Sequence, residues 1–275
     1  MRKTSIICAL LSLCVCAFAA KTQRVTSPNG NVRLEITVGE SLTYSVFYGD
    51  EPIMKDCRLS LLVGQEQFGN KPKLTGIKHT VIDEVVHPVV PLKYASVANK
   101  ANQVALTFKN GYSVEFRAYD NGVAHRFVIK KGKGQADIID EGFDLNLPAA
   151  FTAHVSKTNS FNTSYENPYS HLSTAEYASS DDMTYLPILL ESPQGTKILV
   201  SESDVRDYPH LFFAPTDGNG FKAILPKSPE TWEPKGDRGW RITKELGCIA
   251  RTDATRTLPW RFAVIGTDAT IVENQ

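Results

Sequence analysis

Alternation of apolar and polar residues with a period of two is the main pattern of this chain, and it is clearest at residues 104–129. Three alternating runs are joined there by two Asn-Gly pairs, Asn110-Gly111 and Asn121-Gly122. Asn-Gly readily adopts the positive φ values that a tight hairpin turn requires. The segment is therefore predicted to form a three-stranded antiparallel meander.

The same alternation recurs along the chain at a spacing of roughly ten residues, which is typical of β-sandwiches. A turn or two around Ser173–Ser180 is the only helical pattern. The sequence thus predicts an all-β fold built as a large antiparallel β-sandwich. Further strands are expected at residues 32–38, 42–48, 59–63, 81–92, 186–190, 197–201 and 258–265.

Residues 151–185 depart from this pattern, because Asn, Ser, Thr and Tyr are dense there and the apolar periodicity lapses. A long polar loop inside a compact domain is usually either functional or disordered. The aromatic residues in this segment favour order. We therefore expect an ordered loop that carries function.

The two ends of the chain differ from its middle. Arg2 and Lys3 precede a short apolar stretch that ends in Ala19 and Ala20, which is the pattern of a secretion signal. Residues 1–20 are accordingly predicted to be a signal peptide of a periplasmic or secreted bacterial protein. The sandwich is assigned to residues 21–266, and residues 267–275 are expected to begin a linker.

Charge and cysteine content limit the possible functions. The chain has 30 basic and 30 acidic residues with no basic run, which argues against a nucleic-acid partner. No segment after the signal has the apolar length of a transmembrane helix. Cys57 and Cys248 remain once the signal is removed. In an exported protein they either form a disulfide or stay as two separate buried thiols.

The segment Tyr165-Glu166-Asn167-Pro168-Tyr169 is the first candidate site. Aromatic rings cover the apolar faces of sugars, and a carboxylate between them accepts hydrogen bonds from hydroxyls or binds a hard cation. The alternative is a loop whose tyrosines pack on the sandwich while the glutamate is solvated.

A second acidic segment runs from Glu202 to Pro209 and includes Asp204 and Asp207. Several oxygens close together suit calcium, although their spacing matches no complete calcium-binding loop. The alternative is a polar strand end followed by a turn.

Exposed tryptophans often stack on sugar rings. Trp232 and Trp240 flank a predicted loop and are therefore candidates for sugar contact. Trp260 alternates with apolar residues and is expected in the core. His125 lies within a predicted strand and is expected to be structural.

Taken in order, several short segments make the chain resemble the N-terminal region of glycoside hydrolase family 97. They span nearly all of the chain after the signal. They are Ser27-Pro28-Asn29-Gly30 before Leu34, residues 118–127, Tyr165-Glu166-Asn167-Pro168-Tyr169, Glu202-Ser203-Asp204 with Asp207-Tyr208-Pro209, and Thr257-Leu258-Pro259-Trp260-Arg261.

The resemblance implies a β-super-sandwich of the galactose mutarotase-like type, followed in whole enzymes by a catalytic (β/α)₈ barrel and a small β-domain. Such enzymes cleave α-linked glucosides or galactosides and hold calcium in the active site, with one glutamate from the N-terminal domain. Glu166 is the position that matches this calcium ligand, and Glu202 is the reserve.

The same resemblance implies that the catalytic carboxylates belong to a barrel that is absent from residues 1–275. No catalytic residue is predicted here, because Asp181 and Asp182 are neighbours whose side chains point apart on an extended segment. The leading hypothesis is an accessory domain that helps to bind an α-linked oligosaccharide through Tyr165, Tyr169, Trp232 and Trp240. The alternatives are a stand-alone carbohydrate-binding module and a partner subunit of a separately encoded barrel.

Overall fold

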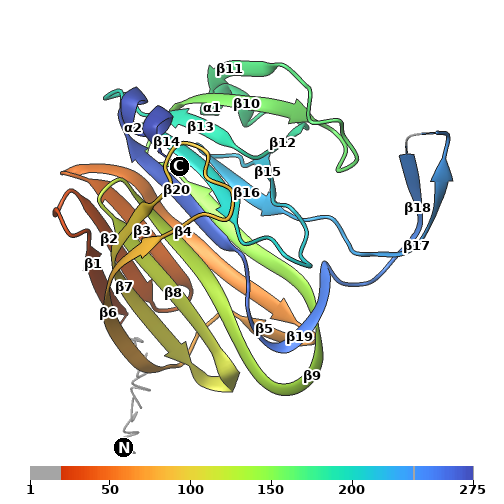
Figure 1. Ribbon diagram of the computed structural model, residues 1–275, viewed down its shortest axis with the longest axis horizontal. Coiled ribbons are helices and arrows are strands. Elements are labelled where there is room, and N and C mark those ends of the chain that lie inside the picture. The colour runs from red at the N-terminus through yellow and green to blue at the C-terminus, as the bar shows by residue number, and fades with distance from the viewer. Residues whose placement is uncertain (1–19, 238, 275) are drawn as a thin grey trace, which may run out of the picture.

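The computed structural model describes residues 20–237 and 239–274, and most of them lie in antiparallel strands (Figure 1). The predicted signal peptide lies outside the described residues. The strands are β1 Lys21–Thr26, β2 Val32–Val38, β3 Leu42–Tyr48, β4 Glu51–Val63, β5 Glu66–Phe68, β6 Leu74–Val86, β7 Val97–Phe108, β8 Tyr112–Tyr119, β9 Gly122–Asn146, β10 Thr152–Thr158, β11 Tyr169–Ser173, β12 Met183–Tyr185, β13 Ile188–Glu191, β14 Lys197–Ser203, β15 Phe212–Pro215, β16 Gly220–Ile224, β17 Pro229–Lys235, β18 Gly239–Glu245, β19 Ala250–Thr257 and β20 Trp260–Gly266.

Two layers of strands pack on each other, which confirms the predicted antiparallel β-sandwich. The first layer is the meander β1–β2–β3–β4, extended by the second half of β9. The second layer runs β6–β7–β8, then the first half of β9, and then β20, β14, β13, β10 and β11. Strand β9 therefore belongs to both layers.

The predicted meander at residues 104–129 is confirmed as β7, β8 and the start of β9. Asn110-Gly111 lies in the first turn, where Asn110 adopts a φ of 64° in a short 3₁₀ turn, Lys109–Gly111. The second turn is Asp120-Asn121, and Gly122 already begins β9 as the partner of Tyr119. A Cβ on Gly111 would lie 2.3 Å from the carbonyl oxygen of Lys130. Glycine is thus required there for close packing as well as for its φ of 73°.

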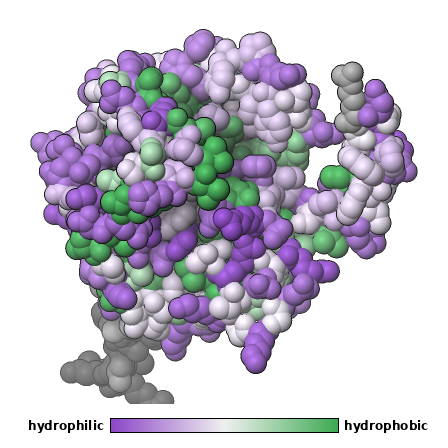
Figure 2. Space-filling view, in the orientation of Figure 1, coloured by the Kyte–Doolittle hydropathy of each residue, from purple (hydrophilic) through white to green (hydrophobic). Residues whose placement is uncertain are grey.

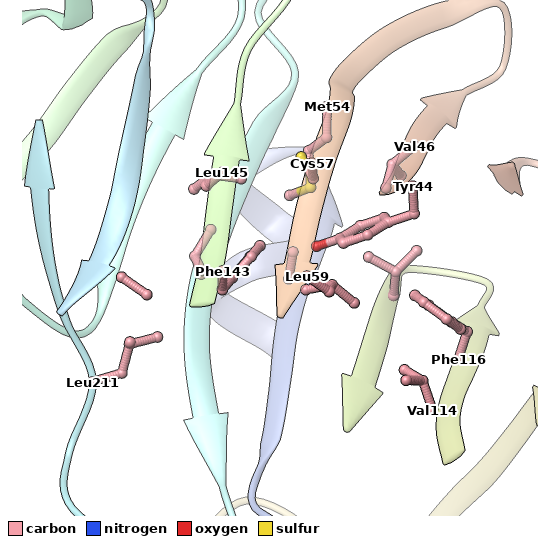
Figure 3. Packing of buried hydrophobic residues seen from close by; sticks show 14 of the residues in the cluster. Tyr44, Val46, Met54, Cys57, Leu59, Val114, Phe116, Phe143, Leu145 and Leu211 are labelled. Atoms are coloured by element: carbon pink, nitrogen blue, oxygen red, sulfur yellow. The ribbon is translucent and has the colours of Figure 1, made fainter. Parts of the chain in front are cut away.

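The core between the layers is made of side chains from alternate positions of these strands (Figure 3). The ring of Tyr44 from β3 lies 5.6 Å from that of Phe116 on β8 and 6.3 Å from that of Phe143 on β9. Buried Leu59 and Leu145 extend the same cluster. Aromatic contacts across the layers thus fix which faces of the two sheets meet.

Several local predictions are corrected by the structure. Residues 151–185 are not one loop, because β10, β11, helix α1 (Thr174–Tyr177) and β12 form within them. Helix α1 agrees with the predicted turn of helix, and a second helix, α2 (Asp268–Glu273), forms within the segment assigned to the start of a linker. The predicted strand at 81–92 ends at Val86, before Pro88 and Pro91.

Cys57 and Cys248 are buried free thiols, so the disulfide alternative is wrong and the alternative of separate thiols is confirmed. The Sγ of Cys57 contacts the backbone of Asn146, and burial raises the pKa of its thiol to about 12. The thiol therefore stays protonated and behaves as a small apolar group.

His125 is a structural residue of the core, as predicted from its position in a strand. Its ring lies 5.3 Å from Tyr44 and 4.9 Å from Phe143, and its Nε2 has no hydrogen-bond partner in the described part of the chain. Burial, followed by the nearby positive charge of Arg261, lowers the pKa of His125 from 6.5 to about 3.

This depressed pKa predicts a loss of stability in acid. The unfolded chain takes up a proton on His125 below about pH 6.5, whereas the folded protein resists it down to about pH 3. The free energy of unfolding is therefore undiminished by this group above pH 6.5 and falls by up to about 1.4 kcal/mol per pH unit below it. The free energy of unfolding of His125→Phe, measured with urea from pH 7 to pH 4, should decrease less steeply with falling pH than that of the wild type. An unchanged slope would contradict the assignment, and exposed His79→Gln is the control.

Candidate functional site

The loop at residues 159–168, between β10 and β11, carries the first predicted site. Its aromatic side chains anchor it to the sandwich: Phe161 packs on Phe212 at 5.0 Å between ring centroids, and Tyr165 packs on Tyr185 at 4.9 Å. Tyr165 also has a φ of 60°, which is rarely adopted by a residue with a side chain. The surrounding contacts therefore hold the backbone in one conformation.

Hydrogen bonds fix Asn167, the residue that follows Glu166 in the chain. The Nδ2 of Asn167 donates to the carbonyl of Lys157 at 2.6 Å, and its backbone N–H donates to the hydroxyl of Tyr185 at 3.2 Å. The carbonyl of Asn167 accepts from the hydroxyl of Ser156 at 3.1 Å. Asn167 therefore holds the loop from both its side chain and its backbone.

Glu166 itself is exposed, and the structure shows no hydrogen bond or ion pair to its carboxylate within the described ranges. Its two neighbours are fixed while its side chain is presented to solvent. Tyr169, at the start of β11, is half exposed. The alternative reading of this segment is right about Tyr165, whose ring packs on the sandwich, and right that the glutamate is solvated.

Glu202, the reserve ligand, lies in a buried ion-pair network. The guanidinium of Arg261 donates to both oxygens of Glu141, at 2.9 and 3.1 Å, and also pairs with Glu202. Tyr208 donates its hydroxyl to Glu141 at 2.7 Å. The Nδ1 of His210 lies 2.8 Å from Glu202 on its exposed side.

The neighbouring carboxylates explain why Arg261 stays charged although it is buried. Burial lowers the pKa of Arg261, but Glu141 and then Glu202 outweigh it and raise that pKa above its usual value. Burial and the adjacent Glu141 raise the pKa of Tyr208, which therefore donates its proton rather than losing it. Because Glu202 is 6% exposed and already paired, it is a poor free ligand in this conformation.

Glu202 nevertheless lies close to the loop at 159–168. Burial raises the pKa of Tyr165, and the negative charge of Glu202 raises it further. Asp204 and Asp207, the other acids of the second segment, both have positive φ values, and Asp204 pairs with Arg206 at 3.3 Å. This segment forms a polar turn, the alternative that the sequence left open.

A groove of about 1100 Å³ opens beside Glu202, between α2 and the connection at residues 87–96. Lys93 in that connection donates to the backbone carbonyls of Val272 and Asn274, the latter at 2.6 Å, so the connection and the helix are joined. Figure 2 shows a hollow in this face with hydrophobic residues along its border. Apolar side chains that line the groove include Val86, Pro88, Val97, Trp260 and Phe262.

Trp260 lies in this groove and not in the core, which corrects the prediction for it. The guanidinium carbons of Arg117 and Arg126 lie 4.5 and 4.2 Å from its ring centroid. Gln103 accepts a hydrogen bond from Arg117 at 2.7 Å, and Glu115 pairs with Arg126 at the same distance. Cation–π contacts therefore hold the indole in place on the sheet.

Trp232 and Trp240 lie on a different sheet from the elements that carry Tyr165 and Tyr169, the other predicted sugar contacts. They are on the two-stranded sheet β17–β18, which projects from the body of the sandwich (Figure 1). Trp232 is opposite Ile242 and Trp240 is opposite Pro234, so these four side chains share one face. Both tryptophans are more than half exposed, but strands replace the predicted loop that they were expected to flank.

Sequence reasoning missed Glu141, Arg261 and the groove. The only available signal was an arginine at an alternating position of a strongly apolar strand. Among the residues described, no three His, Cys, Asp or Glu side chains form a cluster that would hold a metal ion. None of the helices described is long and apolar enough to cross a lipid bilayer.

Comparison with known proteins identifies the family. The model for the glycosyl-hydrolase 97 N-terminal region matches residues 25–275. A retaining α-galactosidase of Bacteroides thetaiotaomicron is 29% identical over 94% of this chain, which spans 41% of that protein. A probable retaining α-galactosidase of Streptomyces bingchenggensis is 24% identical over 90% of this chain and 35% of its own length.

Solved structures show the same fold. A family 97 enzyme from Pseudoalteromonas sp. strain K8, in complex with acarbose, matches with a TM-score of 0.76 at 21% identity, over 92% of this chain and 37% of its own. A β-arabinopyranosidase matches with a TM-score of 0.71 at 20% identity, over 89% and 40%. The chain therefore belongs to glycoside hydrolase family 97 and corresponds to the N-terminal region of that family.

Proposed function

We propose that this chain is the exported accessory domain of an α-glycosidase-type protein. In the full-length enzyme it packs on the catalytic barrel, forms one side of a pocket for an α-linked oligosaccharide and supplies Glu166 as a ligand to a calcium ion. The observation that carries this proposal is a solvated carboxylate on an anchored loop. Tyr165 and Asn167 are fixed by packing and hydrogen bonds, while Glu166 between them makes no contact of its own within the described residues.

The chemistry of Glu166 fits a partial calcium site. Calcium takes six to eight oxygen ligands, and a carboxylate is the usual protein donor. This chain offers one such oxygen donor at the loop and no cluster of three donors in its described residues. The remaining ligands would therefore come from the catalytic domain, and the isolated chain should bind calcium only weakly.

The groove supports docking to a further domain. Apolar side chains such as Val97 and Phe262 line it, and the connection at 87–96, which joins it at Pro88 and Tyr94, also carries the strongly exposed Val89 and Leu92. Contiguous apolar surface of this kind usually marks an interaction site. The Bacteroides relative is longer than the N-terminal region that this chain matches. In such a full-length enzyme, α2 would lead into the domain that covers the groove.

The isolated chain should have no hydrolytic activity. Of the two carboxylates that line the groove, Glu202 is held in a buried ion pair, which leaves only the exposed Glu273. Glycosidases need two carboxyl groups that flank the scissile bond. Glu141 and Glu202 are instead buried on either side of Arg261. Incubation with nitrophenyl α-galactoside and nitrophenyl α-glucoside measures this, and turnover that persists through purification would refute it.

A chimera tests the role of Glu166. Residues 21–275 would replace the matching region of the Bacteroides α-galactosidase, and α-galactoside hydrolysis would be followed against calcium concentration. Glu166→Gln should raise the calcium concentration for half-maximal activity by about tenfold or more, because the site loses one charged ligand. Glu176→Gln, which changes another exposed glutamate, should leave it unchanged. Equal calcium requirements in the two variants would rule out Glu166 as a ligand.

A stand-alone carbohydrate-binding module is the second candidate, and it rests on Trp232 and Trp240. Two exposed indoles share one face of β17–β18, a geometry that suits stacking on sugar rings. If this reading is correct, calorimetry with maltooligosaccharides or galactosides should detect binding that is lost in Trp232→Ala and in Trp240→Ala. Glu233→Ala, on the opposite face of the hairpin, is the matched control. The absence of heat at millimolar sugar would remove this candidate.

A further inference from the structure

Two histidines face each other across neighbouring strands in a part of the sheet that the proposed function does not use. His154 on β10 and His171 on β11 are direct cross-strand partners. Their Nδ1 atoms lie 2.5 Å apart, and their ring centroids are separated by 4.8 Å. Strand β11 pairs only with β10 in the described sheet, so the histidines connect an edge strand to its neighbour.

The pair has at most one proton between its two facing nitrogens. One Nδ1–H donates to the lone pair of the other Nδ1, and a second hydrogen there would bring two N–H groups into contact with no acceptor between them. Burial, and then the neighbouring His171, lower the pKa of His154. The charged groups that act on His154 besides His171 are Glu191 and Lys197, which form an ion pair with each other.

We propose that His154 and His171 form a two-histidine binding site for a divalent transition-metal ion of the zinc, copper or nickel type. The ion takes the place of the shared hydrogen, which moves to Nε2 of the same ring, so that both imidazoles bind the ion as neutral ligands. Imidazole nitrogen is a preferred ligand of these ions, whereas calcium and magnesium prefer oxygen. The site is therefore chemically distinct from the calcium site proposed at Glu166.

The geometry needs only a small change to accept the ion. Metal–nitrogen bonds of about 2.0–2.1 Å place two ligand nitrogens of a tetrahedral site about 3.3 Å apart. His171 is exposed, so its ring has room to rotate by the required amount. The carboxylate of Glu191, opposite Thr152 on the next strand, contributes a favourable negative potential.

Water completes the coordination in this site. The described residues contain no cluster of three metal-binding side chains, so two histidines are the protein's whole contribution. Binding is accordingly weaker than at a structural zinc site with four protein ligands. A bound ion would link β10 to β11 next to the loop at 159–168, and so would stabilise the edge strand from which that loop departs.

The test uses the full mature chain without a histidine tag, titrated with zinc chloride by isothermal calorimetry at pH 7.5. The double variant His154→Gln, His171→Gln should bind zinc at least about tenfold more weakly than the wild type. Calcium chloride should give the same heat with the wild type as with the double variant.

Controls separate the pair from other histidines. His79→Gln, His87→Gln changes two exposed histidines on and beside β6 and should leave zinc binding unchanged, and His210→Gln tests the nitrogen beside Glu202. Zinc should raise the thermal midpoint of the wild type but not of the double variant. Equal zinc affinity in the wild type and the double variant, or no binding at millimolar zinc, would overturn the proposal.

Discussion

The buried pairing of Arg261 with Glu141 and Glu202 is the interaction on which the candidate site depends. Burying three charges is costly unless each is paired and hydrogen-bonded, and here the guanidinium satisfies both carboxylates. Glu141 lies in the half of β9 that joins the first layer, whereas Arg261 and Glu202 lie on β20 and β14 of the second. The network therefore fixes the two layers relative to each other below the loop that carries Glu166.

Local strand patterns could be predicted from the sequence, but the buried face of a strand could not always be. In the last strand, Trp260 is larger and more apolar than Arg261, so Trp260 was expected inside. The structure buries Arg261 and Ala263 and leaves Trp260 half-buried in the groove. The reason is tertiary: the partners that neutralise Arg261 lie 120 and 59 residues away in the chain.

For the candidate loop, too, one part could be predicted from the sequence and another could not. Its composition indicated an ordered, functional segment, and the exposure of Glu166 agrees with the interpretation in which this glutamate is solvated. Its anchoring depends on Tyr185 and Phe212, which are distant in sequence and carry no local signal. The two tryptophans of the β17–β18 hairpin were expected beside a loop, because Pro234 and the glycines around it suggested a break rather than a strand end.

Strand β9 has a consequence for how the protein folds. It pairs with β8 and β20 in one layer and with β4 in the other, and β19 and β16 also join it. Neither sheet is complete without this strand, so the layers are unable to form as independent units. Most of its pairings join distant parts of the chain, and such non-local contacts slow folding. The sandwich should accordingly assemble late and in one cooperative step, after β9 has left the ribosome together with the strands on both of its sides.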